Sequence, residues 1–141
     1  REMKELAENI NFEIRFNEVD SMGVVWHGAY PLYLEDAREA FGRKYGLDYL
    51  TIFGNGCFAP IVEMNFKYKK PLLYGMHPSV AIRYVPTDAA KILFDYTIYD
   101  TADNTVVATG RSVQVFTDTR HQLLWFNPPF YEEWKRKWLE R

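Results

Sequence analysis

Cysteine pairs, long apolar runs and an excess of basic residues are all missing from this sequence. One cysteine, Cys57, stands among 141 residues, so no internal disulfide can form. No apolar run reaches the roughly 18 residues that cross a bilayer, and residues 1–9 are charged rather than apolar, so no secretory signal is expected. Lys and Arg number 17 against 19 Asp and Glu, which argues against a nucleic-acid partner. These absences favour a protein of the reducing cytoplasm.

The sequence does contain enough apolar material for one core. It is 48% hydrophobic and 26% charged, the balance of an ordinary globular domain. Its length predicts a single domain over residues 1–141, with a core at about 10–118 and an aromatic helical tail at about 128–140. Aromatic residues make up 17% of the chain, and such side chains can line a core, an interface or a ligand groove.

The period of the apolar pattern changes near Tyr30. Residues 10–17 alternate between apolar and polar side chains, which predicts a half-buried strand. From Tyr30 to Tyr45 the apolar residues instead fall on one helical stripe, which predicts an amphipathic helix. Pro31 suits the first turn of that helix, and Gly46 is placed to cap its C-terminus.

Strand-like stretches follow the helix, after an ambiguous segment at 47–57 that fits a short helical turn or a loop. They lie at about 58–69, 76–86, 90–99 and 105–118. Gly110, inside the last stretch, marks a bulge or a bend. This order predicts an α+β fold, in which a curved five-stranded antiparallel sheet wraps around one long central helix. Because one helix cannot cover such a sheet fully, we expect an oligomer.

Candidate chemistry concentrates in the loop that precedes the long helix. Asp20 and His27 lie there, next to a helix start whose first backbone N–H groups have no intrahelical partner. Such N–H groups stabilise a carbonyl oxygen that becomes an oxyanion, and a nearby carboxylate can attack the carbonyl or deprotonate a water. Asp20 is equally suited to form or cap a turn, and His27 to serve as an ordinary hydrogen-bonding residue. Local composition leaves both readings open.

The same loop also carries a spaced motif. Its positions are Asp20, Gly23, Val24, Val25, His27 and Tyr30. Farther along, comparable places are filled by Glu35, Ala37 and Arg38. The pattern resembles the active-site signature of the hot-dog-fold 4-hydroxybenzoyl-CoA thioesterase family, and it is closest to the bacterial acyl-CoA thioesterase branch. The resemblance covers most of residues 10–118 and implies a hot-dog fold.

The resemblance also implies roles for individual residues. Asp20 matches the catalytic carboxylate, which acts as a nucleophile or as a general base towards water. His27 matches the position whose backbone N–H polarises the thioester carbonyl, and Gly23, Val25 and Tyr30 are implied substrate contacts. The implied reaction converts an acyl-CoA and water into a free acid and CoA. No metal or cofactor is implied, and the implied assembly is a homodimer or homotetramer with its sites at the subunit interface.

Charged residues outside the loop allow two further hypotheses. Lys67, Lys69 and Lys70 form the tightest basic cluster, and such side chains can hold the phosphates of coenzyme A. Strand alternation would place Lys67 and Lys69 on one face, which is equally compatible with an ordinary solvated surface. Glu35 falls off the apolar stripe and is expected to pair with Arg38. A different branch of the fold places its catalytic acid on this helix, so the role of Glu35 stays open.

Two alternatives to hydrolysis remain at this point. The same fold serves as an acyl-CoA or fatty-acyl binding module without turnover, in which Asp20 is only a capping acceptor. A dehydratase branch acts on hydroxyacyl thioesters with a His and an acid in another arrangement. No Cys and His spacing matches a zinc site, and no dinucleotide or phosphate-loop fingerprint occurs.

Overall fold

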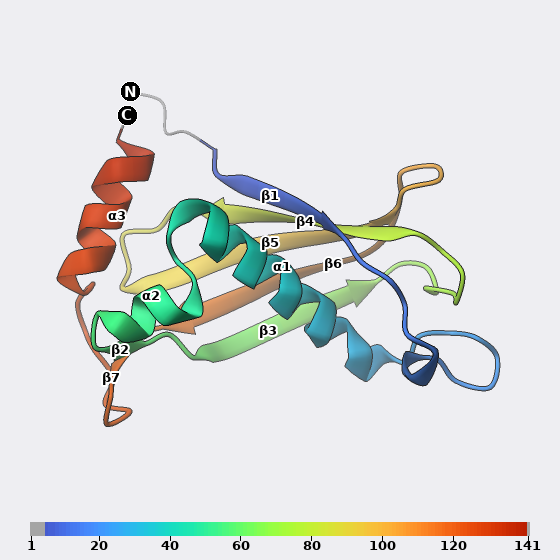
Figure 1. The fold of residues 1–141 in the computed structure, drawn as a ribbon, viewed down its shortest axis with the longest axis horizontal. Helices are drawn as coiled ribbons and strands as arrows, with labels where there is room; N and C mark the ends of the chain where they lie inside the picture. The colour runs from blue at the N-terminus through green and yellow to red at the C-terminus, as the bar shows by residue number, and fades with distance from the viewer. Residues whose placement is uncertain (1–4, 141) are drawn as a thin grey trace.

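A five-stranded antiparallel sheet and one long helix form the body of the protein (Figure 1). The computed structural model describes residues 5–140, so the ends of the predicted domain 1–141 lie outside the described residues. The strands follow the order β1-β4-β5-β6-β3. Their bounds are Ala7–Asn11 for β1, Ile61–Tyr68 for β3, Pro78–Val85 for β4, Lys91–Asp100 for β5 and Thr105–Val115 for β6. The predicted α+β hot-dog architecture is confirmed.

The long helix α1 (Tyr30–Tyr45) begins and ends where its sequence predicts. It follows directly on a short 3-10 helix, η2 (His27–Ala29), so the chain is helical from 27 to 45. Gly46 takes a left-handed conformation with φ of 79°, and its N–H donates to the carbonyl of Gly42. A residue without Cβ adopts that conformation at little cost, which ends the helix there.

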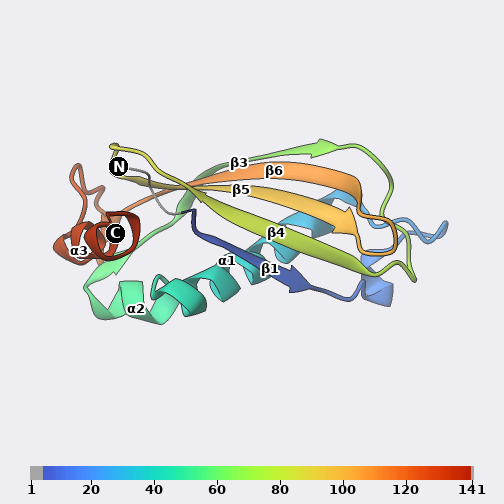
Figure 2. The same ribbon diagram turned by 90° about the horizontal axis from the view of Figure 1, so that it is seen from above.

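Helix α1 crosses one face of the sheet at an angle (Figures 1 and 2). It contacts β1 and β4, and its buried stripe packs against the inner face of the strands. The members of that stripe include Tyr33, Leu34, Ala37 and Phe41. Met64 and Phe66, on the inner face of the opposite edge strand β3, are only partly buried. Tyr30 of α1 packs against Phe66 and Tyr68 of β3, with ring centroids 6.3 and 4.9 Å apart, so the start of the helix lies beside this edge strand.

The first strand differs from its prediction. The expected strand at 10–17 is replaced by β1 at Ala7–Asn11, and the chain then leaves the ladder. Phe12 stacks on Tyr33 with ring centroids 4.1 Å apart, and Ile14 is buried, while Phe16 is 76% exposed. The alternation of apolar and polar residues at 10–17 correctly indicated one buried face. A segment can bury alternate side chains, however, without hydrogen-bonding to a neighbouring strand.

Gly110 is explained by close approach rather than by a bulge. It sits in regular register between Tyr96 and Phe66. A Cβ at Gly110 would lie 2.9 Å from the carbonyl oxygen of Asn65, so only glycine fits without displacement. The irregularity between β5 and β6 falls elsewhere, between Ile98 and Tyr99.

Smaller elements close the end of the sheet near the C-terminus of α1. The ambiguous segment contains α2 (Tyr49–Gly54), whose first turn is capped by the Asp48 side chain accepting from the backbone N–H of Thr51. A two-stranded ribbon joins β2 (Cys57–Phe58) to β7 (Thr117–Asp118). The tail forms α3 (Pro129–Leu139), where Tyr131 and Trp134 are buried in the same core cluster as α1. No helix within residues 5–140 has the length and apolar character needed to cross a membrane.

Candidate active site

Asp20 shapes a tight turn before the helix. Its Oδ1 accepts hydrogen bonds from the backbone N–H groups of Met22 and Val24, at 2.8 and 3.1 Å. The backbone N–H of Asp20 donates to the carbonyl of Val24 at 2.9 Å, and Gly23 takes a φ of 77°. Both side-chain hydrogen bonds fall on Oδ1, and no residue among 5–140 donates one to Oδ2. Asp20 is therefore a turn former whose second carboxylate oxygen faces solvent.

The helix start is held in place by backbone contacts and a tryptophan. The N–H of Trp26 donates to the carbonyl of Glu18 at 3.1 Å, and the N–H of Ala29 donates to the carbonyl of Trp26 at 3.0 Å. A Cβ on Gly28 would lie 2.0 Å from the Trp26 ring. The indole therefore rests directly on the backbone at Gly28, and this close contact depends on the missing side chain.

Glu18 is a supporting residue that the sequence pattern did not reveal. It is buried, and its Oε1 accepts hydrogen bonds from the Tyr33 hydroxyl at 2.7 Å and from the backbone N–H of Arg15 at 2.8 Å. Burial, together with the hydrogen bond to Glu18, raises the pKa of the Tyr33 hydroxyl well above its usual range. This pair ties the loop to α1. In the sequence, the signal for this pair was Tyr33, because the hydroxyl of a buried tyrosine needs a hydrogen-bond partner.

A shallow depression of about 300 Å³ lies beside the helix start. Its wall combines apolar, aromatic and basic side chains, contributed by Val24, Val25, His27, Tyr30, Tyr68, Lys69, Lys70 and Pro71. The hydroxyl of Tyr68 donates to the carbonyl of His27 at 3.3 Å, and the Tyr30 ring packs edge-on against the Tyr68 ring at 4.9 Å. Five of the eight predicted site residues thus meet at one place, and Tyr68 joins them.

The other three predicted site residues lie elsewhere. Asp20 and Gly23 are in the preceding turn and are not among the residues that line the depression. Lys67 lies in a groove on the outer face of the sheet, with Arg83 and Arg111. The expectation that Lys67 and Lys69 share a face is wrong, because β3 ends at Tyr68 and strand alternation stops there.

The two remaining lysines are positioned by the backbone. The N–H groups of Lys69 and Lys70 both donate to the carbonyl of Val107, at 2.9 and 3.0 Å. Val107 is the extra residue at the irregularity between β5 and β6, where Ile98 pairs with Ala108 and the next residue of β5 pairs with Val106. The bulge therefore places both lysines beside the helix start.

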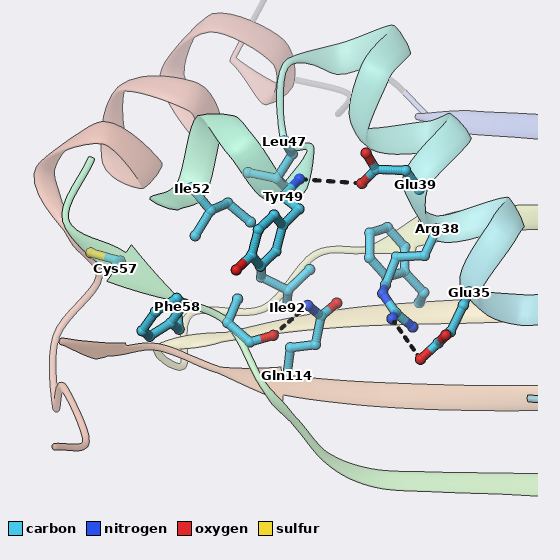
Figure 3. Close-up of a pocket in the computed structure, with 12 residues that line it drawn as sticks. Glu35, Arg38, Glu39, Leu47, Tyr49, Ile52, Cys57, Phe58, Ile92 and Gln114 are labelled. Carbon is cyan, nitrogen blue, oxygen red and sulfur yellow. Dashed lines mark hydrogen bonds and ion pairs between the residues drawn. The ribbon is translucent and has the colours of Figure 1, made fainter. Parts of the chain in front are cut away.

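A second cavity, of about 130 Å³, lies beside the middle of α1 and the segment that follows the helix (Figure 3). It is enclosed by α1, α2, β5 and β6, and the predicted Glu35–Arg38 ion pair, 3.7 Å long, stands at its side. No residue of the Asp20 turn lines this cavity. No group of three or more His, Cys, Asp or Glu residues within 5–140 is arranged to hold a metal ion.

Comparisons with known proteins agree with this architecture. One curated relative, a putative acyl-CoA thioesterase YneP of Bacillus subtilis, is 34% identical over 90 residues, covering 64% of this chain and 65% of the relative. Another, the chloroplastic acyl-acyl carrier protein thioesterase ATL3 of Arabidopsis thaliana, is 27% identical over 120 residues, covering 85% of this chain and 63% of the relative. The chain thus spans slightly less than two thirds of the length of these two relatives.

Solved structures match over nearly the whole chain. A hypothetical protein from Thermus thermophilus superposes with a TM-score of 0.79 at 26% identity, covering 92% of this chain and 95% of that one. The DHNA-CoA thioesterase from Staphylococcus aureus gives a TM-score of 0.81 at 24% identity, covering 93% and 89%, and supports the fold alone. The family model of the thioesterase-like superfamily matches residues 14–139. With the strand order, the long helix and the depression at its start, this match establishes that the chain belongs to the thioesterase-like superfamily.

Proposed function

We propose that this protein hydrolyses acyl-CoA thioesters to a free acid and coenzyme A. The observation that carries the proposal is the depression at the helix start, where His27, Tyr30, Tyr68 and two lysines meet. Membership of the thioesterase-like superfamily supports it, as do relatives that are named acyl-CoA and acyl-acyl carrier protein thioesterases.

The helix start supplies electrostatic stabilisation in this proposal. The helical run begins at His27, so the first N–H groups of the run have no partner within the helix. The positive end of the helix dipole lies at the same place. A thioester carbonyl seated in the depression would direct its oxygen towards the N–H groups of His27 and Gly28. Donors held in place before the reaction stabilise the developing oxyanion without reorganisation.

Asp20 supplies the acid–base or nucleophilic chemistry. Two backbone N–H groups hold its Oδ1, which orients the carboxylate and leaves Oδ2 for reaction. As a general base, Oδ2 takes a proton from water while the water oxygen attacks the carbonyl carbon; the carbon–sulfur bond then breaks, and CoA leaves as a thiolate that takes up the proton. As a nucleophile, Oδ2 attacks the carbonyl carbon, the carbon–sulfur bond breaks and CoA leaves as a thiolate, which gives a mixed anhydride. Water then cleaves the anhydride, which releases the free acid, regenerates the Asp20 carboxylate and supplies the proton that the thiolate takes up.

A second copy of the chain completes the site. Strand β3 is an edge strand with an unpaired backbone, and its Val62 and Tyr68 side chains are exposed; such an edge pairs readily with another strand. Antiparallel pairing of β3 with its own copy, about a two-fold axis, sets the Tyr68 end of one strand beside the Ile61 end of the other. The depression of one protomer then adjoins the second cavity of its partner. We therefore propose a homodimer, or a homotetramer made of two such dimers, with sites at the interface.

Lys69 and Lys70 are proposed to bind the phosphates of coenzyme A. They border the depression from the side of β3, and no acidic residue is among its lining residues. Ammonium groups at the rim attract phosphate oxygens. Lys67, on the opposite face of the sheet, has no part in this proposal.

The alternative of a binding module without turnover has one observation in its favour. The two hydrogen bonds that Asp20 accepts are those of an ordinary turn, and a turn former needs no catalytic role. The test is thiol release from a panel of short, long and aromatic acyl-CoAs by the wild type and by Asp20→Asn, with CoA affinity measured in parallel.

Hydrolysis by the wild type, lost in Asp20→Asn with CoA affinity unchanged, is the expected result. The amide of Asn keeps the turn acceptor and removes the base. If neither protein releases thiol from any acyl-CoA that it binds, the binding-module alternative holds instead.

A further inference from the structure

An open groove of about 480 Å³ lies between the end of α2 and the segment that leads into α3. Its volume falls within the range of small-molecule sites, about 300–1,000 Å³. None of its lining residues carries a charge; they are Asn55, Cys57, Leu124, Trp125, Phe126, Asn127, Pro128, Pro129 and Phe130. A groove lined mainly by aromatic rings and prolines suits a ligand that is neutral and flat.

Two aromatic side chains of this groove have little packing of their own. Trp125 is 79% exposed and Phe126 is 83% exposed. Neither ring stacks on another aromatic ring within residues 5–140, whereas Phe130, in the same groove, packs edge-on against Phe116. Large aromatic faces left in water favour a partner that covers them, and a flat ring system covers them by stacking.

The groove also contains a buried acceptor whose orientation is fixed. Nδ2 of Asn127 donates to Oε1 of Glu132 at 2.7 Å. Because a carboxylate only accepts hydrogen bonds, the amide of Asn127 cannot be reversed, and its Oδ1 stays on the other side. Oδ1 is buried and accepts no hydrogen bond from the described residues. A donor on a ligand would satisfy it, and the exposed Phe126 side chain can turn aside to admit that donor.

These properties together describe a ligand. It is neutral, because no charged side chain lines the groove, and it is flat, because the exposed groups are aromatic faces. It carries a hydrogen-bond donor for Oδ1 of Asn127. Adenine meets all three requirements, since it has no charge at neutral pH, stacks through its faces and carries a 6-amino group on its edge. Within an acyl-CoA, adenine is the only aromatic ring outside the acyl group.

The groove lies at the end of the sheet that a second copy would bring to the helix start. Strand β2, which pairs with β7, comes directly before β3 (Figure 1). Cys57 of β2 lines the groove and stands four residues before Ile61, at most about 14 Å away in an extended chain. In the antiparallel dimer proposed above, the Ile61 end of one β3 adjoins the Tyr68 end of the other. The groove therefore lies near the lysines that are proposed to bind the phosphates in the partner.

We propose that this groove binds the adenine of coenzyme A whose thioester is held at the helix start of the partner protomer. The base stacks on the exposed rings of Trp125 and Phe126, and its 6-amino group donates to Oδ1 of Asn127. This assignment rests on the proposed function and extends it to the end of the substrate remote from the thioester. Contacts with such a remote group help to hold the reacting end in place.

Binding of the base can be measured without any hydrolysis. The probes are adenosine and purine riboside, which lacks only the 6-amino group, and dissociation constants are obtained from NMR titrations. We expect the wild type to bind adenosine about tenfold more tightly, the scale of one buried acceptor that gains a donor. Asn127→Leu should abolish this preference. Trp125→Ala should weaken the binding of both probes by about tenfold or more. Because Trp125 is exposed, this variant tests the groove even if Asn127→Leu fails to fold.

A matched control is available at another exposed ring. Phe16 is 76% exposed and does not line the groove. Phe16→Ala should therefore bind adenosine as tightly as the wild type does. Three results overturn the proposal: no binding of adenosine by the wild type, equal affinities of the wild type for the two probes, or undiminished binding by Trp125→Ala.

Hydrolysis separates this proposal from the one on which it rests. The substrates are the best acyl-CoA of the panel and the matching acyl-pantetheine, which lacks the nucleotide. We expect Trp125→Ala to lower kcat/KM about tenfold for the acyl-CoA and to leave that for the acyl-pantetheine unchanged. An equal loss for both substrates, or no loss for either, overturns the adenine assignment while hydrolysis itself stands. No hydrolysis of any acyl-CoA, with the preference for adenosine retained, overturns the thioesterase proposal and leaves an adenine site.

Discussion

Two turns at opposite ends of this protein are built in the same way. In each, an aspartate Oδ1 accepts from the backbone N–H groups two and four residues later, at 2.8 and 3.1 Å for Asp20 and at 2.9 and 3.0 Å for Asp118. Each aspartate N–H also donates at 2.9 Å to the carbonyl four residues later. The residue three positions after the aspartate takes a positive φ in both turns, 77° at Gly23 and 66° at His121.

The two turns differ in the elements that surround them. The Asp20 turn leads into the helix start at His27, beside the depression with two lysines. The Asp118 turn comes after the short strand β7, and no helix begins directly after it. Identical local hydrogen bonding therefore accompanies very different surroundings. A turn-forming aspartate is not in itself a sign of catalysis, and the neighbouring helix start is what gives Asp20 its proposed role.

The largest expected contrast is in activity. Asp20→Asn should lower kcat for the best acyl-CoA by at least about 100-fold, the scale of a lost general base. Asp118→Asn should leave kcat unchanged, because that carboxylate has no reacting group beside it. Asn accepts the same turn hydrogen bonds, so both variants should melt close to the wild type. An equal loss of activity in the two variants would show that the turns matter only for folding.

The hydrogen bond between Tyr33 and Glu18, which ties the loop to α1, gives the next largest expected effect, on stability. Tyr33→Phe removes the hydroxyl that donates to buried Glu18, which should lower the free energy of unfolding by about 1–3 kcal/mol. Tyr99→Phe is the control, since its hydroxyl donates to Asn9 at an exposed position and should cost less than about 0.5 kcal/mol. Urea denaturation of both variants measures the difference, and equal losses would argue against Glu18 as the anchor of the loop.

The positive-φ residues provide a smaller contrast. Gly23→Ala should destabilise the protein by about 1 kcal/mol, because Cβ disfavours a left-handed backbone. His121→Gly should change stability by less than about 0.5 kcal/mol. The relief of backbone strain is offset by a freer unfolded chain and by the lost stacking of His121 on Phe58, at 5.4 Å. Thermal melting in parallel checks this, and a stabilised Gly23→Ala would contradict the assigned turn geometry.

The smallest effect concerns an aspartate held by cations instead of N–H groups. Asp95 pairs with Arg111 at 2.6 Å and with Arg83 at 2.8 Å, and the hydrogen bond from Arg111 lowers the pKa of Asp95 below its usual 3.8. A lowered folded-state pKa adds stability above the unfolded pKa, and this stability disappears as the pH falls through the folded value. Asp95→Asn should therefore cost up to about 1 kcal/mol at pH 7 and less at pH 3. A loss that is the same at both pH values would contradict the ion pairs.

Much of the fold could be predicted from local patterns in the sequence. The stripe from Tyr30 to Tyr45 and the glycine after it predicted α1 correctly, because amphipathic periodicity and capping act within a few residues. The strand order along the chain was also correct. The first strand was displaced, because alternation reports burial and does not say whether a neighbouring strand is present.

The candidate site was predicted only in part. Val25, His27, Tyr30, Lys69 and Lys70 were named from sequence and share one depression. Tyr68, which joins them, carried no more signal than the other aromatic residues that can line a core or a ligand groove. The second cavity is lined by residues from α1, α2, β5 and β6, and no local motif records that these elements meet.

The sequence by itself determined the long helix, the turn motif before it and the succession of strands, because each depends on contacts between near neighbours in the chain. Tertiary structure alone decided which side chains share a cavity. Arg38 of α1 and Gln114 of β6 line one cavity, and β3 is an edge strand because of the strand order of the whole sheet. Such placements depend on strand register and helix packing across the whole chain, and local periodicity carries no information about either.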